Sequence, residues 1–103
     1  MIRVSVIYNK VGDSTFDYDY YVGSHMPMAG REFNAVRWDV DNIVATPDGS
    51  PSPIHCIGHL YFNSMEDMQK AMVEPNVGKV MGDIPNYYSG GQPTVLISEI
   101  HQG

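Results

Sequence analysis

The sequence predicts an α+β fold of the ferredoxin-like kind, with two helical segments packed on one face of a four-stranded antiparallel sheet. One observation is the order of the hydrophobic patterns, which run strand, helix, strand, strand, helix, strand along 103 residues. A second is the composition, 43% hydrophobic and 17% charged, which is typical of a globular chain. We therefore expect a single domain covering residues 1–103.

Four segments have strand patterns. Residues 2–8 alternate large apolar side chains with smaller or polar ones, which is the period of a half-buried strand. Residues 36–44 are rich in β-branched side chains, and residues 54–62 and 94–101 complete the set. A loop rich in proline and glycine, residues 45–53, connects the second strand to the third.

The two helical segments have recognisable beginnings. Asp17 can cap a first helix, and Pro27 predicts either an interruption or a new turn, with a kink over residues 25–27. Ser64 and Asp67 form the pattern S-x-x-D that opens a second helix, and further helical turns are expected over residues 77–84. Methionines at helical spacing predict the core face of this second helix: Met65, Met68 and Met72.

The third and fourth strands carry large apolar groups on both faces. Residues 54–62 place Leu60 and Phe62 on one side and Ile57 and Tyr61 on the other. Helices cover one sheet face, and an apolar second face is seldom left in water. The sequence therefore predicts a homodimer that covers the second face.

Charge and cysteine content narrow the partners and the compartment. A formal charge of −6 and a pI near 4.8 disfavour nucleic acid and anionic membrane surfaces as partners. No apolar stretch approaches the roughly 20 residues that span a bilayer. The lone Cys56 excludes an internal disulfide and favours a reducing environment, so we expect a cytoplasmic protein.

Residues 16–28 read F-D-Y-D-Y-Y-V-G-S-H-M-P-M, and this segment resembles the EthD family of dimeric α+β barrel proteins. Residues 58–62 and 83–87 extend the resemblance over nearly the whole chain. It implies a ferredoxin-like protomer whose sheet meets that of a partner in a barrel, with a pocket between sheet and helices. It also implies an oxidoreductase-like or polyketide-cyclase-like activity on aromatic substrates, without a tightly held cofactor.

His25 is the candidate catalytic residue. An imidazole with an unperturbed pKa near 6.5 can give or take a proton at neutral pH, and the helix end before Pro27 exposes backbone groups that can orient the ring. The alternative is a structural role, in which His25 caps the interrupted helix and stabilises the bend.

Several further residues are candidates for substrate binding. They share aromatic or flexible apolar side chains that can line a cavity for a small apolar or aromatic molecule, and they are Tyr20, Tyr21, Met28, Trp38 and Tyr87. The alternative is that they belong to the core. Asp83, from its place in the family pattern, is a candidate for holding the histidine tautomer.

Other kinds of chemistry have little support. His55 and His59 have the spacing of a metal pair on a helix, but on a strand at about 3.3 Å per residue the rings lie about 13 Å apart. No metal site and no cofactor are predicted, phosphate and dinucleotide motifs are absent, and Cys56 within a strand is expected to be a buried small residue.

These observations favour an EthD-like protein that acts on a small apolar or aromatic metabolite, with His25 moving protons in an oxidation, cyclisation or dehydration. One alternative is a non-catalytic binding or accessory module with the same fold. A second alternative is a barrel that uses haem or a metal.

Overall fold

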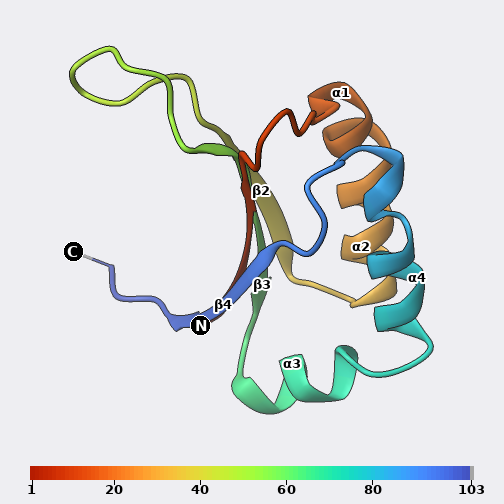
Figure 1. Ribbon diagram of the computed structural model, residues 1–103. Coiled ribbons are helices and arrows are strands. Elements are labelled where there is room, and N and C mark those ends of the chain that lie inside the picture. Colours follow the sequence, from red (N-terminus) through yellow and green to blue (C-terminus); the bar gives the residue numbers. More distant parts are fainter. Residues whose placement is uncertain (103) are drawn as a thin grey trace.

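The computed structural model describes residues 1–102, and its architecture is a four-stranded antiparallel sheet with all helices on one face (Figure 1). The strand order is β2-β3-β1-β4, so β1 and β3 lie in the centre of the sheet and β2 and β4 lie at its edges. The strands are β1 (Ile2–Asn9), β2 (Arg37–Asn42), β3 (Ile54–Phe62) and β4 (Thr94–Glu99). The predicted α+β class and the positions of all four strands are confirmed, although β2 and β4 are shorter than expected.

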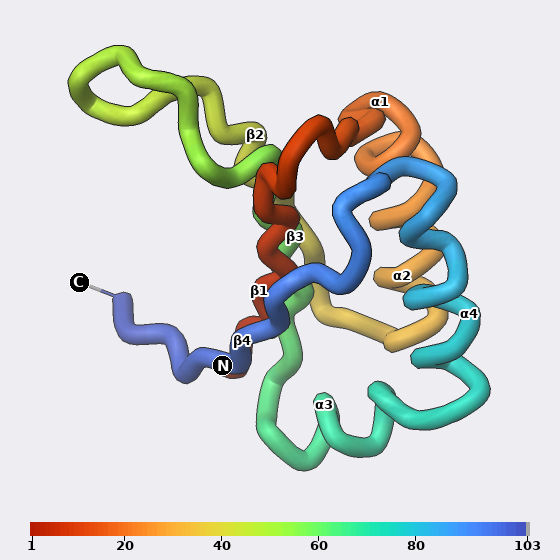
Figure 2. The backbone as a smooth tube through the Cα atoms, viewed as in Figure 1, coloured from red at the N-terminus to blue at the C-terminus, as the bar shows by residue number. Residues whose placement is uncertain are grey.

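The helices form a second layer against this sheet, as the tube in Figure 2 shows. They are α1 (Tyr18–Tyr20), the π-helical turn η1 (Tyr21–His25), α2 (Met26–Glu32), α3 (Met65–Ala71), α4 (Asn76–Gly82) and the 3-10 turn η2 (Ile84–Asn86). The helices α2 and α4 lie side by side over the sheet, and α3 lies at the end where β3 finishes (Figure 1).

The first helical segment does not break at Pro27. Asp17 caps it as predicted, accepting a hydrogen bond from the Tyr20 amide. The chain then makes one wide turn, in which the Met26 amide bonds to the Tyr21 carbonyl, and continues as α2. Pro27 lies in the first turn of α2, where a proline is tolerated. A π-helical turn therefore stands where the kink was expected, and the helix continues past Pro27.

The second helical segment begins as predicted, because the Ser64 side chain accepts a hydrogen bond from the Asp67 amide. The expected core face of three methionines is wrong for Met65, which is exposed, whereas Met68 is buried and Met72 is half-buried. The helix ends at Ala71, so it is too short for residues over two full turns to share one buried stripe.

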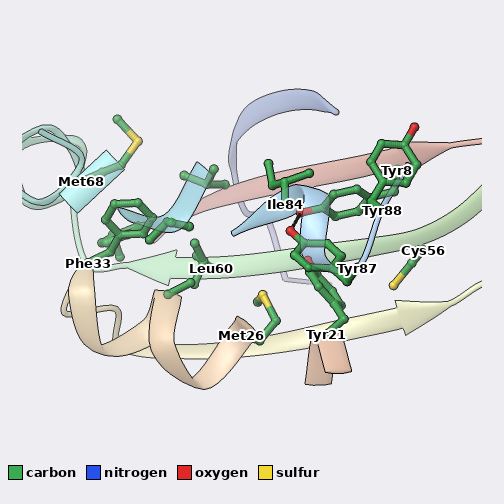
Figure 3. Packing of buried hydrophobic residues seen from close by; sticks show 14 residues of the cluster. Tyr8, Tyr21, Met26, Phe33, Cys56, Leu60, Met68, Ile84, Tyr87 and Tyr88 are labelled. Atoms are coloured by element: carbon green, nitrogen blue, oxygen red, sulfur yellow. Dashed lines mark hydrogen bonds between the residues drawn. The ribbon is translucent and has the colours of Figure 1, made fainter. Parts of the chain in front are cut away.

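The core lies between the helix layer and the sheet (Figure 3). Val4 and Tyr8 of β1 pair with Leu60 and Cys56 of β3, and all four side chains point toward the helices. Rings from the helix side complete one end of this core, among them Tyr21, Tyr87 and Tyr88 (Figure 3). The strand alternation therefore sets which side chains can meet the first helix and the segment after α4.

No helix of the described residues covers the opposite face of the sheet, which we call the open face (Figure 1). The strand register places these residues on it: Arg3, Ser5, Ile7, Arg37, Asp39, Asp41, Ile57, His59, Tyr61, Thr94, Leu96 and Ser98. The open face is mixed in character. Large apolar or aromatic side chains lie there as expected, namely Ile7, Ile57, Tyr61 and Leu96, but β1 and β2 also contribute charged and hydroxyl groups. Exposed apolar side chains gather on β4, where Val95, Leu96 and Ile97 are 43%, 52% and 51% exposed.

None of the helices within residues 1–102 has the length and the apolar character needed to cross a membrane.

Candidate functional site

His25 lies at the end of η1, where it is only 3% exposed and contacts the segment that follows α4. Its Nδ1 is 2.9 Å from Oδ2 of Asp83, and its Nε2 is 3.1 Å from the hydroxyl oxygen of Tyr87. Asp83 is the C-cap of α4, and Tyr87 follows η2. The imidazole therefore links the first helical segment to the last, rather than capping its own helix.

Asp83 accepts hydrogen bonds from three side chains. In addition to His25, the Tyr20 hydroxyl donates at 2.8 Å and the Asn86 amide donates at 2.8 Å. Burial alone would raise the pKa of Asp83, but the hydrogen bonds from Asn86, His25 and Tyr20 outweigh it and lower the pKa below the usual value. Asp83 is therefore a carboxylate at neutral pH.

The hydrogen bonds fix the tautomer of His25. Burial lowers the pKa of His25 despite the opposing effect of Asp83, so the ring is neutral at pH 7. A carboxylate can only accept, which places the single ring proton on Nδ1 and leaves Nε2 as an acceptor for the Tyr87 hydroxyl. The Tyr87 oxygen in turn accepts from the Tyr8 hydroxyl at 2.7 Å. We call this ordered series Tyr8, Tyr87, His25 and Asp83 the relay.

The phenols of the relay stay protonated over the physiological range. Burial raises the pKa of Tyr8 to about 12, and burial also raises the pKa of Tyr87. The Tyr87 hydroxyl donates to His25 and accepts from Tyr8, so it can pass one proton on and receive another. The relay can therefore move a proton toward Nε2 of His25 or away from it, and the buried phenols are neutral before and after the transfer.

Tyr21 packs on the relay without joining it. Its ring stacks on His25 with centroids 5.3 Å apart and an interplanar angle of 15°. Its hydroxyl is buried and has no hydrogen-bond partner among residues 1–102. It lies against Gly58 in the middle of β3, where any side chain on residue 58 would overlap it. Gly58 is thus required for this ring to reach the sheet.

The structure brings most of the predicted site residues together, namely Tyr20, Tyr21, His25, Asp83 and Tyr87. It does not bring Trp38 or Met28 there. Trp38 lies on β2 with its indole against Gly30, and Met28 is half-buried in α2 against the core. Both therefore belong to packing between α2 and the sheet.

Tyr8, Asn86 and Tyr88 were not predicted as site residues. Tyr8 and Tyr87 are separated by 79 positions, and nothing local in the sequence connects them. The one available signal was the alternation of the first strand, which places Tyr8 on the side that the helices cover. Asn86 lies within residues 83–87, which carry part of the family resemblance, so this motif was the signal for it.

A groove of about 500 Å³ lies next to the relay, and Tyr88 forms part of its wall. The Tyr88 ring is 5.1 Å from the Tyr8 ring, so a single layer of aromatic side chain separates the groove from the relay. The other lining residues are Met81, Ile84, Pro85, Ser89, Gly91 and Gln92. At His25 itself, the rings of Tyr21 and Tyr87 pack directly on the imidazole, and Phe16 packs on both of these rings.

Within residues 1–102, no cluster of three or more histidine, cysteine or acidic side chains is arranged to hold a metal ion. Cys56 is buried as predicted, and burial raises the pKa of its thiol to about 12, which makes it a poor nucleophile.

The fold and the site define a small α+β protein with an aromatic and histidine cluster between its helices and sheet. The model of the EthD domain matches residues 13–91, and the chain belongs to the EthD family. The match includes every residue of the relay except Tyr8.

Known relatives resemble the chain over almost its full length. An uncharacterized 11.0 kDa protein of the thcB-thcC intergenic region of Rhodococcus erythropolis is 25% identical over 96% of this chain and 95% of its own length. The crystal structure of an EthD-like protein from Ralstonia eutropha JMP134 is 29% identical, with a TM-score of 0.83 over 95% of this chain and 89% of that one.

Two further crystal structures share the fold alone. An EthD family protein from Bacillus halodurans C-125 has a TM-score of 0.77 at 21% identity, covering 98% of this chain and 99% of its own. HapK from Hahella chejuensis has a TM-score of 0.61 at 13% identity, covering 100% of this chain and 95% of its own.

Proposed function

We propose that this EthD-family protein binds a small apolar or aromatic molecule in the groove beside Tyr88, and that His25 gives or takes a proton during its conversion. The observation that carries the proposal is the ordered relay, in which Asp83 holds the ring proton on Nδ1 and leaves Nε2 as a base. A buried neutral imidazole oriented by a carboxylate is the usual arrangement for acid–base work. No tightly held cofactor is part of the proposal.

Proton transfer suits some reactions of aromatic metabolites better than others. Cyclisation and dehydration remove one proton and return another, and they need no electron acceptor. The relay supplies both steps through a single ring nitrogen, whereas an oxidation also needs an oxidant. Among the oxidoreductase-like, cyclase-like and dehydratase-like activities, we therefore favour the cyclase or dehydratase.

Access to the relay requires a local movement. His25 and Tyr87 are both buried and are not among the residues that line the groove, whereas Tyr88 lines it and packs on Tyr8 of the relay. Rotation of the Tyr88 ring toward the groove opens a path from the bound molecule to the Tyr87 hydroxyl, which passes the proton to His25. The Tyr88 hydroxyl donates to the carbonyl of Asn9 at 2.6 Å, and the ring packs on Tyr8, Phe16 and His55. The rotation must break this hydrogen bond and these ring contacts.

The proposal can be tested with 2-tetralone, an aromatic ketone with exchangeable protons next to its carbonyl. Proton NMR in heavy water measures how fast the protein exchanges these protons for deuterium. We expect the His25→Gln variant to exchange them at least about a hundredfold more slowly, the usual scale for losing an acid–base group. Asp19→Asn is the matched control, because Asp19 is exposed in the same helical segment. Exchange that is absent in the native chain, or equal in His25→Gln, contradicts the catalytic role.

A non-catalytic binding module is the second candidate, and the burial of His25 among its partners favours it. Both ring nitrogens of His25 already have partners, and the ring is almost fully shielded. In this case 1-naphthol binds in the groove, as titration calorimetry would show, but 2-tetralone is not exchanged. Met81→Lys in the groove should weaken naphthol binding at least about tenfold under either candidate, whereas Lys79→Ala on the exposed side of α4 should not.

We also propose that the protein is a cytoplasmic homodimer in which the second copy covers β4. The support is the exposed apolar side chains of β4 at the sheet edge, with Leu96 on the open face and Val95 and Ile97 on the opposite face. Light scattering after gel filtration should give twice 11.5 kDa for the native chain and a monomer for Ile97→Asp. Val44→Asp, at an exposed loop position, should leave the dimer intact. A native monomer at micromolar concentration contradicts the proposal.

A further inference from the structure

A second groove of about 500 Å³ lies between α2 and the start of β2, and we call it the Trp38 groove. Trp38 is paired with Leu60 across the strands, so its side chain points to the sheet face that the helices cover and not to the open face. No residue of this groove lines the groove beside Tyr88. Its lining residues are Pro27, Gly30, Arg31, Asn34, Ala35, Val36, Arg37 and Trp38.

The Trp38 groove forms because the chain turns back sharply after α2. Asn34 has a φ of 49°, a left-handed conformation that asparagine tolerates. The Asn34 amide donates to the Arg31 carbonyl at 3.1 Å, and the Ala35 amide donates to the Gly30 carbonyl at 3.0 Å. These two hydrogen bonds make a Schellman motif at the end of the helix. The start of β2 therefore runs back beside the last turns of α2.

Gly30 allows the indole of Trp38 to lie on α2. A Cβ atom on residue 30 would be 2.9 Å from Cδ1 of Trp38, so a larger residue there would displace the ring. Trp38 is half-buried, and part of its side chain is open to the groove that it lines. An indole offers an apolar ring for packing and one N–H group that can only donate. This wall suits a flat ligand that carries a hydrogen-bond acceptor.

The charged residues of the Trp38 groove are both arginines, although the chain has 12 acidic and only 6 basic side chains. Arg37 is already engaged, because it forms an ion pair with Asp39 and lies over the ring of Tyr61. Arg31 is exposed and forms no ion pair within residues 1–102. A free guanidinium presents a planar set of donors that matches the two oxygens of a carboxylate.

We propose that the Trp38 groove binds a small aromatic carboxylate. The Arg31 guanidinium donates to the carboxylate oxygens, and the indole of Trp38 packs on the aromatic ring of the ligand. No acidic residue lines the groove, so nothing in its wall repels an anion. The groove beside Tyr88 differs in this respect, because no charged residue lines it and it suits an uncharged molecule. The two grooves would thus select ligands of different charge.

Benzoate is the probe, and the chain supplies its own reporter because it contains one tryptophan. In a proton–nitrogen NMR spectrum the indole N–H of Trp38 gives a single signal, which should shift to saturation as benzoate is added. Benzamide has the same shape without the charge and should bind at least about tenfold more weakly, on the scale of a hydrogen bond to a charged group. Added salt should weaken the binding of benzoate, because it screens an exposed charge.

Arg31→Gln should weaken benzoate binding about tenfold as well, and because Arg31 is exposed the variant should keep its fold. Lys10→Gln is the matched control, since it removes the same charge from an exposed position outside the groove and should bind benzoate like the native chain. Arg31→Lys should have an intermediate affinity, because lysine keeps the charge but lacks the planar set of donors.

Three results would each overturn the proposal. They are an indole signal that does not shift to saturation with benzoate, benzamide binding as tight as benzoate binding, and a loss of affinity in Arg31→Gln no larger than in Lys10→Gln. None of these measurements involves His25 or the groove beside Tyr88, so they leave the function proposed for the relay untouched.

Discussion

The contact between Tyr21 and Gly58 gives the sharpest prediction about the core. The Tyr21 hydroxyl is buried without a partner, and a Cβ atom on residue 58 would overlap this oxygen and lie 3.0 Å from Cζ of the same ring. The ring cannot withdraw, because it stacks on His25 and meets the Tyr8 ring edge-on at 5.2 Å. Gly58→Ala therefore forces one methyl group into a filled space.

The size of the effect follows from this geometry. Overpacking a core by one carbon costs about 1–3 kcal/mol, and the fixed ring places Gly58→Ala near about 3 kcal/mol. Tyr21→Phe removes an unsatisfied buried hydroxyl and should raise the free energy of unfolding by about 1 kcal/mol. In the double variant the overlap with oxygen is gone, so we expect a favourable coupling of about 1–2 kcal/mol between the two sites.

Urea unfolding followed by the fluorescence of Trp38 measures all four chains of this cycle. Gly23→Ala is the control, because a Cβ atom on residue 23 would meet nothing within 4 Å. This substitution in a helical turn should leave stability unchanged or raise it by up to about 1 kcal/mol. Native stability in Gly58→Ala, or a loss that Tyr21→Phe does not reduce, would refute the packing described for these rings.

Three further predictions concern the titratable groups. Burial lowers the pKa of His25, so the fold should lose stability as the pH falls below the ordinary value of 6.5. His25→Gln should flatten urea-measured stability between pH 7 and 5, with a contribution of the same sign left from His55, whose pKa burial also lowers. An unchanged slope would contradict a neutral buried ring. Asp83→Asn removes the charge and one of the two oxygens that accept hydrogen bonds from Tyr20, His25 and Asn86, and should cost about 2 kcal/mol in urea unfolding. Asp19→Asn should cost less than about 0.5 kcal/mol, and equal stabilities would argue against the described bonds. The thiol pKa of about 12 predicts that iodoacetamide modifies Cys56 at least about a hundredfold more slowly in the folded chain than in urea, and similar rates would show that the thiol is exposed.

Local patterns in the sequence were sufficient for the fold. The alternation in β1 and β3 and the S-x-x-D cap of α3 are visible within a few residues, and the structure places these elements within one residue of the prediction. The π-helical turn η1 was not predictable in the same way. It depends on how Tyr21 and His25 pack against partners distant in sequence, and these partners determine whether the helix breaks at Pro27.

The character of the open face required the strand register. The apolar residues of β3 and β4 suggested a second apolar face, but the neighbours across the sheet are Ser5, Asp39 and Asp41. Which residues lie opposite one another depends on pairing over tens of residues, which single-strand patterns do not specify. The hydrogen bonds of His59 with Ser5 and Asp41 depend on the same pairing, so single-strand patterns could not predict them.

The candidate site was predictable where it lies within a motif. The family resemblance carried His25, Tyr20, Tyr21 and the segment from Asp83 to Tyr87, and these residues meet as a cluster. Aromatic character alone was a weaker guide, since a large ring can serve the core as readily as a site. Trp38 illustrates this, because it packs on α2 away from the relay.

The tautomer of His25 tests the relay most directly, because every proposed proton transfer depends on an Nε2 that carries no proton. Nitrogen-15 NMR of the histidine rings at neutral pH can distinguish the two nitrogens, with His25→Gln identifying the signals and Tyr87→Phe perturbing one of them. We predict a neutral ring with its proton on Nδ1, and an unprotonated Nε2 whose shift changes in Tyr87→Phe. A proton found on Nε2, or a doubly protonated ring at pH 7, would contradict the account.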